Sequence, residues 1–393
     1  MLVVGAALLA AGGSARAVYA PIPDVEQGRL LTVYLGAGYY YDTNLFGAAE
    51  DGIESMVFQA KPTIVANMPF SDQSFLSASY QLSLDYFNNR PGAHLLAGHS
   101  LGARLAHTFT QRLEGEINES FQITRNPESL LPGAGGGGVV NPDQSSTFNQ
   151  IDGKMLYSAS SRVALRGKVR ARNIAYDNEY LRHALDHGEY LAGVEVVRAS
   201  RENLRVSAEY RWQAFRYRHE GALKDKDSHI LFAGADYAPT KRTACSSRLG
   251  VETLLRRDGE NTALPYAELG AKHDYSEGGF VSAGYAFARQ ESSNAYLYPD
   301  MLTHHFFVNA QHALGRALAV SLTADWQPAR LKGRKGVADG IGETNLKLGG
   351  ALTYSSGQKW SVSLTLDYDH VRSDDPGRNL ERMRTGVHGR WVF

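Results

Sequence analysis

Apolar and polar residues alternate along most of this chain, in segments of about ten to fifteen residues separated by turn-rich stretches. In the clearest segment, serine, threonine and aspartate alternate with Trp360, Val362, Leu364, Leu366 and Tyr368. A period of two residues places successive side chains on opposite faces of a β-strand. The pattern therefore predicts strands with one apolar and one polar face, repeated from about residue 29 to the C-terminus.

The alternation recurs often enough to predict about eighteen strands, with sixteen as the alternative count. Short turns such as Gly315-Arg316 alternate with longer polar loops such as 331–342. This rhythm is typical of outer-membrane barrels, and an even strand count places both termini on the periplasmic side. The expected spans are 29–42, 55–68, 73–87, 95–110, 112–125, 146–161, 162–176, 187–199, 203–218, 228–240, 243–256, 263–275, 278–291, 302–314, 317–330, 343–355, 358–372 and 382–393.

A soluble antiparallel sandwich also alternates, so it is the competing architecture. Strands of about ten residues or more suit a tilted membrane crossing better than a soluble sheet. Aromatic residues end the apolar rows, as in the girdle of a membrane barrel. We therefore predict an all-β fold, a transmembrane antiparallel up-and-down β-barrel spanning residues 29–393 and located in the bacterial outer membrane.

The N-terminus differs from the rest of the chain. Met1–Ala11 is almost entirely apolar, and Ala15-Arg16-Ala17 and Val18-Tyr19-Ala20 both fit a small-x-small cleavage site. We predict a signal peptide at 1–20, followed by a periplasmic segment at 21–28. One feature of a signal peptide is missing, because no Lys or Arg precedes the apolar run. A buried N-terminal helix is the alternative.

Composition agrees with a membrane barrel. The 393 residues include 41 basic and 41 acidic ones, and this zero net charge gives no indication of a nucleic-acid partner. After the N-terminus no run of 18 apolar residues occurs, which excludes a bundle of transmembrane helices. The only cysteine, Cys245, can form no internal disulfide, and we assign it no role.

One motif could carry catalysis. Gly98-His99-Ser100-Leu101-Gly102 matches G-x-S-x-G, the nucleophile elbow of lipases and esterases. That chemistry needs a strand-to-helix turn that exposes the serine, but the following residues continue as a strand. We expect Ser100 to lie in the barrel wall and expect no catalytic residues, so an outer-membrane hydrolase is only the third function hypothesis.

Neither a cofactor nor a metal is expected. Gly133–Gly138 lacks the Gly-Lys-Ser/Thr and the helix of a phosphate-binding loop, and we interpret it as part of a flexible external loop. No His, Cys, Asp or Glu spacing, including His304-His305, predicts a metal site.

Charged side chains of a membrane barrel have to point into the lumen, because facing lipid is costly. The same strand parity gives two interpretations: a basic track for anions, or a wall in which cations pair with inward acids such as Asp152 and Glu195. The densest row is Arg166, Lys168, Arg170 and Arg172, on one face of one strand. The predicted pore-lining basic residues are Arg104, Lys154, Arg166, Lys168, Arg170, Arg172, Arg205, Arg211, Arg248, Lys272, Lys347, Arg384 and Arg390.

The end of the first strand carries the motif Tyr41, Asp42, Asn44 and Phe46. Its physical interpretation is interfacial tyrosine followed by Asx turns that start the first external loop. The motif resembles the opening signature of the β-barrel porin 2-like family of outer-membrane β-barrels. That resemblance implies a barrel over nearly the whole mature chain and a link to exopolysaccharide export, and it implies no catalytic residues.

The C-terminus ends an alternating row with Trp391 and Phe393. A final strand that ends in an aromatic residue resembles the assembly signal of outer-membrane barrels. We therefore expect the barrel-assembly machinery to be a partner of this chain.

Two function hypotheses share this architecture. The first is a porin-like channel that exports an anionic exopolysaccharide across the outer membrane. The alternative is a general or anion-preferring diffusion porin for small solutes, narrowed by an inward loop for which 126–145 is the candidate. Expected partners are outer-membrane lipid and lipopolysaccharide, the polysaccharide or small anionic solute and, for an exporter, periplasmic export components.

Overall fold

The computed structural model describes residues 29–124, 145–257, 259, 261–291, 297–334, 336–337, 340–357 and 359–393. The predicted signal peptide at 1–20, the segment 21–28 and nearly all of the loop 126–145 lie outside these residues. Within them, no helix is long and apolar enough to cross a membrane. The elements are β1 (Leu31–Asp42), β2 (Ser55–Ser71), β3 (Ser74–Phe87), β4 (Leu95–Thr110), β5 (Leu113–Thr124), β6 (Ser146–Ser158), β7 (Val163–Tyr176), α1 (Glu179–Leu185), β8 (His187–Arg201), β9 (Leu204–Tyr217), α2 (Gly221–Lys224), β10 (Lys226–Thr240), β11 (Thr243–Arg256), β12 (Thr262–Ser276), β13 (Gly279–Glu291), β14 (Asp300–Ala313), β15 (Leu318–Lys332), β16 (Gly342–Ser356), β17 (Trp360–Ser373), the 3₁₀ turn η1 (Pro376–Arg378) and β18 (Leu380–Val392).

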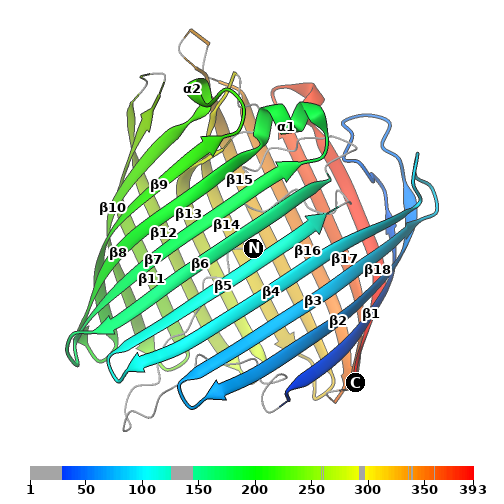
Figure 1. Cartoon of the computed structure of the whole chain (residues 1–393). Helices are drawn as coiled ribbons and strands as arrows, with labels where there is room; N and C mark the ends of the chain where they lie inside the picture. The colour runs from blue at the N-terminus through cyan, green and yellow to red at the C-terminus, as the bar shows by residue number, and fades with distance from the viewer. Residues whose placement is uncertain are drawn as a thin grey trace.

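These strands form one closed antiparallel sheet of 18 strands, shown in Figure 1. Each strand pairs with its neighbours in sequence, and β18 closes the ring against β1, from Tyr34↔Val392 to Asp42↔Arg384. A closed ring leaves no edge of unpaired backbone groups, which lipid could not solvate. The predicted up-and-down barrel is therefore confirmed, whereas the count of sixteen and the sandwich are wrong.

On every strand, alternate residues face the outside and the lumen of the barrel. On β7, Leu165 and Val169 are exposed on the outside, while Arg166 and Arg170 alternate with them and form ion pairs with neighbouring strands. The same exposure of alternate apolar residues recurs around the ring, for example at Leu231 on β10. An outer surface of exposed apolar side chains is stable only where lipid covers it.

The two rims of the barrel differ. Turns on one rim are as short as residues 111–112 and 202–203, whereas loops on the other are as long as 43–54 and 177–186. Figure 1 shows α1 and α2 on the long-loop rim and the C-terminus on the other. The backbone N–H of Phe393 donates to the carbonyl of Val33 at 2.9 Å, so β1 starts where β18 ends.

Strand boundaries differ from the expected spans by a few residues. The strands expected at 146–161 and 162–176 are separated by residues 159–162, because the Ser160 hydroxyl accepts hydrogen bonds from the N–H groups of Arg162 and Val163. These bonds close a tight turn, which the alternation of apolar and polar residues does not reveal.

Candidate functional site

The inner wall of the barrel is the candidate functional site. All the basic residues predicted to line the pore lie on strands, at the parity opposite to exposed apolar neighbours such as Leu105, Met155 and Leu249. Since those neighbours face outward, the basic side chains face the lumen. They are Arg104 on β4, Lys154 on β6, Arg166, Lys168, Arg170 and Arg172 on β7, Arg205 and Arg211 on β9, Arg248 on β11, Lys272 on β12, Lys347 on β16, and Arg384 and Arg390 on β18.

Each cation of the row on β7 has an acidic partner on a nearby strand. These N···O distances are 2.6 Å for Arg166–Glu195, 2.7 Å for Lys168–Glu209, 2.7 Å for Arg170–Asp152 and 3.2 Å for Arg172–Glu189. The row is therefore not a track of free charges, because each of its cations forms an ion pair with an acid on another strand.

In three of these pairs the cation is much more exposed than the acid, whereas Arg172 and Glu189 are almost equally exposed. The Arg166 side chain is 41% exposed while that of Glu195 is 3% exposed, and the corresponding values are 43% for Arg170 and 21% for Asp152. The acids thus lie beneath the cations, against the wall. A solute in the lumen meets guanidinium groups before carboxylates, so this part of the wall presents positive charge.

The remaining predicted cations divide into paired and unpaired groups. Arg104 and Lys154 share Glu116, and Arg390 lies 4.1 Å over the ring of Tyr34. Among the described residues, Arg205, Lys347 and Arg390 have no ion pair. The other pairs are Arg211–Glu209, Arg248–Asp236, Lys272–Asp274 and Arg384–Asp369.

The β13–β14 hairpin crosses part of the lumen mouth. The β12–β13 ladder ends at Ala267↔Phe287, although β12 begins at Thr262 and β13 continues to Glu291. Beyond that point Asp300, the first residue of β14, lies 2.8 Å from Lys226 on β10. Four strand spacings of about 4.8 Å would separate these strands by roughly 19 Å along the wall. The hairpin therefore leans inward over β10–β12.

A buried charge cluster holds the hairpin in place. The carboxylate of Asp300 also pairs with Arg256 on β11 and, at 3.2 Å, with Arg289 on β13. All four side chains are buried. Sequence reasoning missed this cluster, because its residues have no common periodicity in the chain.

Two further contacts join loops above the mouth. The Lys224 ammonium of α2 donates to the carbonyl of His183 in α1 at 2.9 Å, and Arg334 donates to the carbonyl of Leu223 at 2.8 Å. Burial lowers the pKa of Lys224 below its usual value. Residues of three external loops thus meet on one side of the pore.

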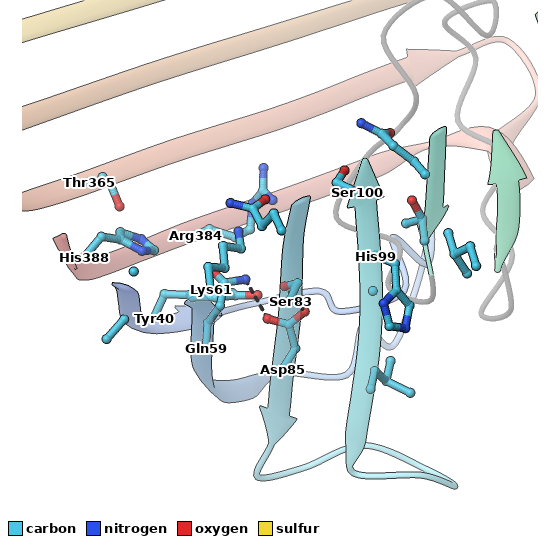
Figure 2. A pocket seen from close by; sticks show the side chains of 18 of the residues that line it. Tyr40, Gln59, Lys61, Ser83, Asp85, His99, Ser100, Thr365, Arg384 and His388 are labelled. Atoms are coloured by element: carbon cyan, nitrogen blue, oxygen red, sulfur yellow. Dashed lines mark hydrogen bonds between the residues drawn. The ribbon is translucent and has the colours of Figure 1, made fainter. Parts of the chain in front are cut away.

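The opposite side of the lumen contains a cavity of about 480 Å³, lined by β1–β5, β17 and β18. Figure 2 shows its side chains, among them Lys61, Arg384 and His388. Gln59 donates to Asp85 at 2.6 Å across this wall, and the side chains of Gln81 and Ser83 also line the cavity. Charged, neutral polar and apolar residues therefore all border this open part of the lumen.

Ser100 lies within β4, paired with Gln81 on β3 and Gln122 on β5. No strand-to-helix turn follows it, since β4 continues to Thr110. Figure 2 shows His99 on the opposite side of the strand, where its Nδ1 is 2.9 Å from the hydroxyl of Tyr80. The geometry of a nucleophile elbow is absent here. Among the described residues, no group of three His, Cys, Asp or Glu side chains could hold a metal ion.

The motif of the first strand lies at the seam of the barrel. Asp42 is buried, accepts from the N–H of Asn44 at 3.0 Å as in an Asx turn, and pairs with Arg382 of β18. The Asn44 amide donates to the carbonyls of Ala48 and Glu381. Beside them, Tyr41 faces outward with its hydroxyl bonded to an acid of the loop, while Phe46 lies against the apolar cluster around Leu45. The motif joins the first loop to both ends of the ring.

The C-terminal aromatics lie on the outside at the opposite rim. Trp391 pairs with Leu35 of β1 and Trp360 of β17, and its side chain is exposed. Phe393 follows β18, and its side chain is 71% exposed. Both side chains are accessible to lipid or to another protein.

No protein-family model matches the chain, and no curated protein matches it. The resemblance to the β-barrel porin 2-like family therefore stays a resemblance of one short motif. Solved structures with similar folds include OccK5 (OpdH) of Pseudomonas aeruginosa, at 10% identity and a TM-score of 0.49 over 92% of this chain and 98% of that one. OpdK of the same organism has 12% identity and a TM-score of 0.48 over 92% and 99%. The ferric enterobactin receptor PfeA of Pseudomonas aeruginosa has 9% identity and a TM-score of 0.48 over 93% of this chain and 81% of that one.

At these values the likeness to solved structures concerns barrel architecture, and we base the function on the chain's own residues. A closed 18-stranded ring, an apolar outer surface and a charged inner wall define the class. The chain is a multi-pass β-barrel of the bacterial outer membrane with a porin-like architecture.

Proposed function

We propose that the chain is a water-filled diffusion channel for small solutes, with a preference for anions. Barrels of about sixteen to eighteen strands enclose an aqueous lumen that side chains do not fill. The inward β13–β14 hairpin, held by Asp300, narrows one side of the mouth and leaves the polar cavity beside Lys61 open. A narrowed, hydrated path favours small solutes over polymers.

The observation that carries the anion preference is the exposure of cations above their acidic partners on β7. Exposed Arg166 and Arg170 offer a passing anion weak contacts, because the lumen is wet and salt screens charges over about 8–10 Å. Weak, repeated contacts permit passage, whereas a tight site would retain the solute.

Export of an anionic exopolysaccharide is the second candidate. The spacing of the β7 row supports it, since cations two residues apart recur about every 6.6 Å along the strand and could contact successive charges of a polymer. The inward hairpin favours the small-solute proposal, because a polymer needs a wide continuous path. Separate periplasmic components would be partners only of the exporter.

Ion selectivity in planar bilayers tests the proposal. Replacing Arg166, Lys168, Arg170 and Arg172 together by Gln should shift the reversal potential in a salt gradient towards cation preference. Lys272→Gln is the matched control, because it removes a lumen cation whose partner Asp274 is exposed at least as much. Lys272→Gln should shift the reversal potential less than the replacement of a single exposed β7 cation by Gln.

A charge-neutral variant makes the test sharper. Arg166→Gln/Glu195→Gln combined with Arg170→Gln/Asp152→Asn keeps the net charge but removes the exposed cations. Anion preference should fall in this variant too, whereas unchanged selectivity would refute the proposed role of exposure. Loss of surface polysaccharide in cells, with bilayer selectivity unaffected, would favour the export candidate instead. Heat-modifiable gel migration verifies that each variant is folded.

A further inference from the structure

Three tyrosine–histidine pairs repeat one geometry on the outer surface of the barrel. The distance from the tyrosine hydroxyl oxygen to the histidine Nδ1 is 2.8–2.9 Å in each, and the ring centroids are 6.1–6.2 Å apart. In every pair the two residues are 19 positions apart in sequence. The pairs are Tyr80–His99 on β3 and β4, Tyr210–His229 on β9 and β10, and Tyr285–His304 on β13 and β14.

The register explains the repetition. Tyr80 is opposite Leu101, Tyr210 is opposite Leu231 and Tyr285 is opposite Phe306, and each histidine precedes that opposite residue by two. Tyrosine and histidine therefore lie diagonally on one face of a hairpin, within reach of long side chains. That face is the outer one, because Leu101, Leu231 and Phe306 are exposed there.

All three pairs lie near the long-loop rim. His99 is four residues after the start of β4, and His229 is three residues after the start of β10. At about 3.3 Å per residue and a tilt near 45°, these positions are roughly 7–10 Å below the strand ends. His304 is opposite Phe287, the last residue of β13 that pairs with β12, so it lies where the hairpin leaves the wall. The depth of His99 and His229 corresponds to the layer where lipid headgroups meet acyl chains.

Each pair has one hydrogen-bond donor to spare. A neutral imidazole has one N–H and a phenol one O–H, and the bond between the rings uses one of these two hydrogens. Whichever ring donates within the pair, the other hydrogen remains available for an acceptor outside it. An outward donor in lipid needs such an acceptor, because an unsatisfied polar group is costly there.

The surrounding outer surface supplies little competition for that donor. Leu82 and Leu101 flank His99, and Phe306 flanks His304. Next to His229, the carboxylate of Asp227 is already held by Arg216 at 2.7 Å and by the indole of Trp212 at 3.2 Å. Among the described residues, each of the three histidines has one side-chain hydrogen bond, to its paired tyrosine, so lipid can supply the acceptor for the remaining donor.

We propose that the three pairs are binding sites for the phosphorylated headgroup of lipid in the external leaflet. Phosphate oxygens at headgroup depth accept strong hydrogen bonds from imidazole or phenol donors. Three sites spread around the ring then fix the height of the barrel in the membrane. This proposal depends on the outer-membrane location of the barrel and is independent of what passes through the lumen.

Binding of lipid A to the folded full chain in neutral detergent tests the proposal, with bound lipid counted by native mass spectrometry. The triple variant His99→Phe/His229→Phe/His304→Phe keeps the aromatic rings and removes the imidazole donors. Its apparent affinity should fall about tenfold, as expected for one charge-assisted hydrogen bond per site. If the triple variant does not fold, the three single variants carry the test, each losing one site.

A matched control exists at the other rim. His312, the penultimate residue of β14, is 3.0 Å from the hydroxyl of Tyr275, which also donates to the carbonyl of Gln311, so His312→Phe removes a tyrosine-paired imidazole without a spare donor from the periplasmic side. The His312→Phe variant should bind lipid A as wild type does. A second control uses fully dephosphorylated lipid A: wild type should bind it as weakly as the triple variant binds lipid A. Equal losses in both histidine variants, undiminished binding in the triple variant, or equal binding of dephosphorylated lipid would each overturn the proposal.

Discussion

Arg382 donates from Nε to both carboxylate oxygens of Asp42 at 3.0 Å, across the seam where the last strand meets the first. The residues are 340 positions apart in sequence, and both side chains are buried. A buried ion pair by itself is weak evidence for stability, but removing one partner leaves an uncompensated buried charge.

Asp42→Ala should therefore destabilise the closed barrel by about 3–5 kcal/mol. Arg382 would lose the Asp42 carboxylate, and the Asn44 N–H would lose its acceptor at the same time. Urea titration in detergent, followed by heat-modifiable gel migration, measures the change. Asp274→Ala breaks an exposed pair and should cost at most about 1 kcal/mol. Equal midpoints for the two variants would contradict a special role of the seam.

A second prediction concerns the inward hairpin. Asp300→Asn removes the carboxylate that pairs with Lys226, Arg256 and Arg289 at the centre of this cluster. The remaining cations would repel one another while buried, and this favours movement of the β13–β14 hairpin away from β10 and β11. Single-channel conductance in planar bilayers should increase. A conductance equal to that of wild type, in a folded variant, would show that the hairpin does not limit the pore.

The wall could be predicted from the sequence because its signal is local. Alternation with period two determines which residues of a strand share a face, so the lumen position of Arg166 or Arg384 follows from its immediate neighbours. Turn residues and loop lengths likewise determine the order of an up-and-down barrel.

The hairpin could not be predicted in this way. Lys226 and Asp300 are 74 residues apart, and their contact depends on β13 leaving β12 after Phe287. The sequence also does not predict which charged side chains are exposed. Parity places Arg170 and Asp152 in the lumen but does not show which one covers the other. Such features arise from side-chain packing in three dimensions, and period-two patterning carries no information about them.

Ser100 provides a negative prediction. Ser100→Ala should leave channel conductance and barrel stability unchanged, because the serine lies in a regular strand and its neighbour His99 faces the opposite side. Purified protein should show no ester hydrolysis that depends on this residue. Hydrolysis present in wild type and lost in Ser100→Ala would overturn the assignment of Ser100 to the wall.

Deletion of Phe393 tests the assembly signal. The side chain is exposed beyond β18, where it contributes little to packing, while its N–H still bonds to Val33. We expect less folded barrel in the outer membrane of cells after deletion, with nearly unchanged stability of the protein refolded in detergent. A loss of stability in vitro as large as the loss in cells would indicate a structural role and no recognition by assembly machinery.

The last prediction separates exposure from charge count along β7. Arg170 and Arg172 carry the same charge and are two residues apart, but their side chains are 43% and 13% exposed. If passing anions respond to the groups they can reach, Arg170→Gln should shift the reversal potential several times more than Arg172→Gln. The opposite order is expected for stability, because Arg172 is more buried than Arg170, and its loss leaves the Glu189 carboxylate without a guanidinium. Bilayer recordings and urea titrations of the two single variants measure both orders. Equal shifts in reversal potential would mean that selectivity follows the summed charge of the wall, and the exposure argument for anion preference would then fail.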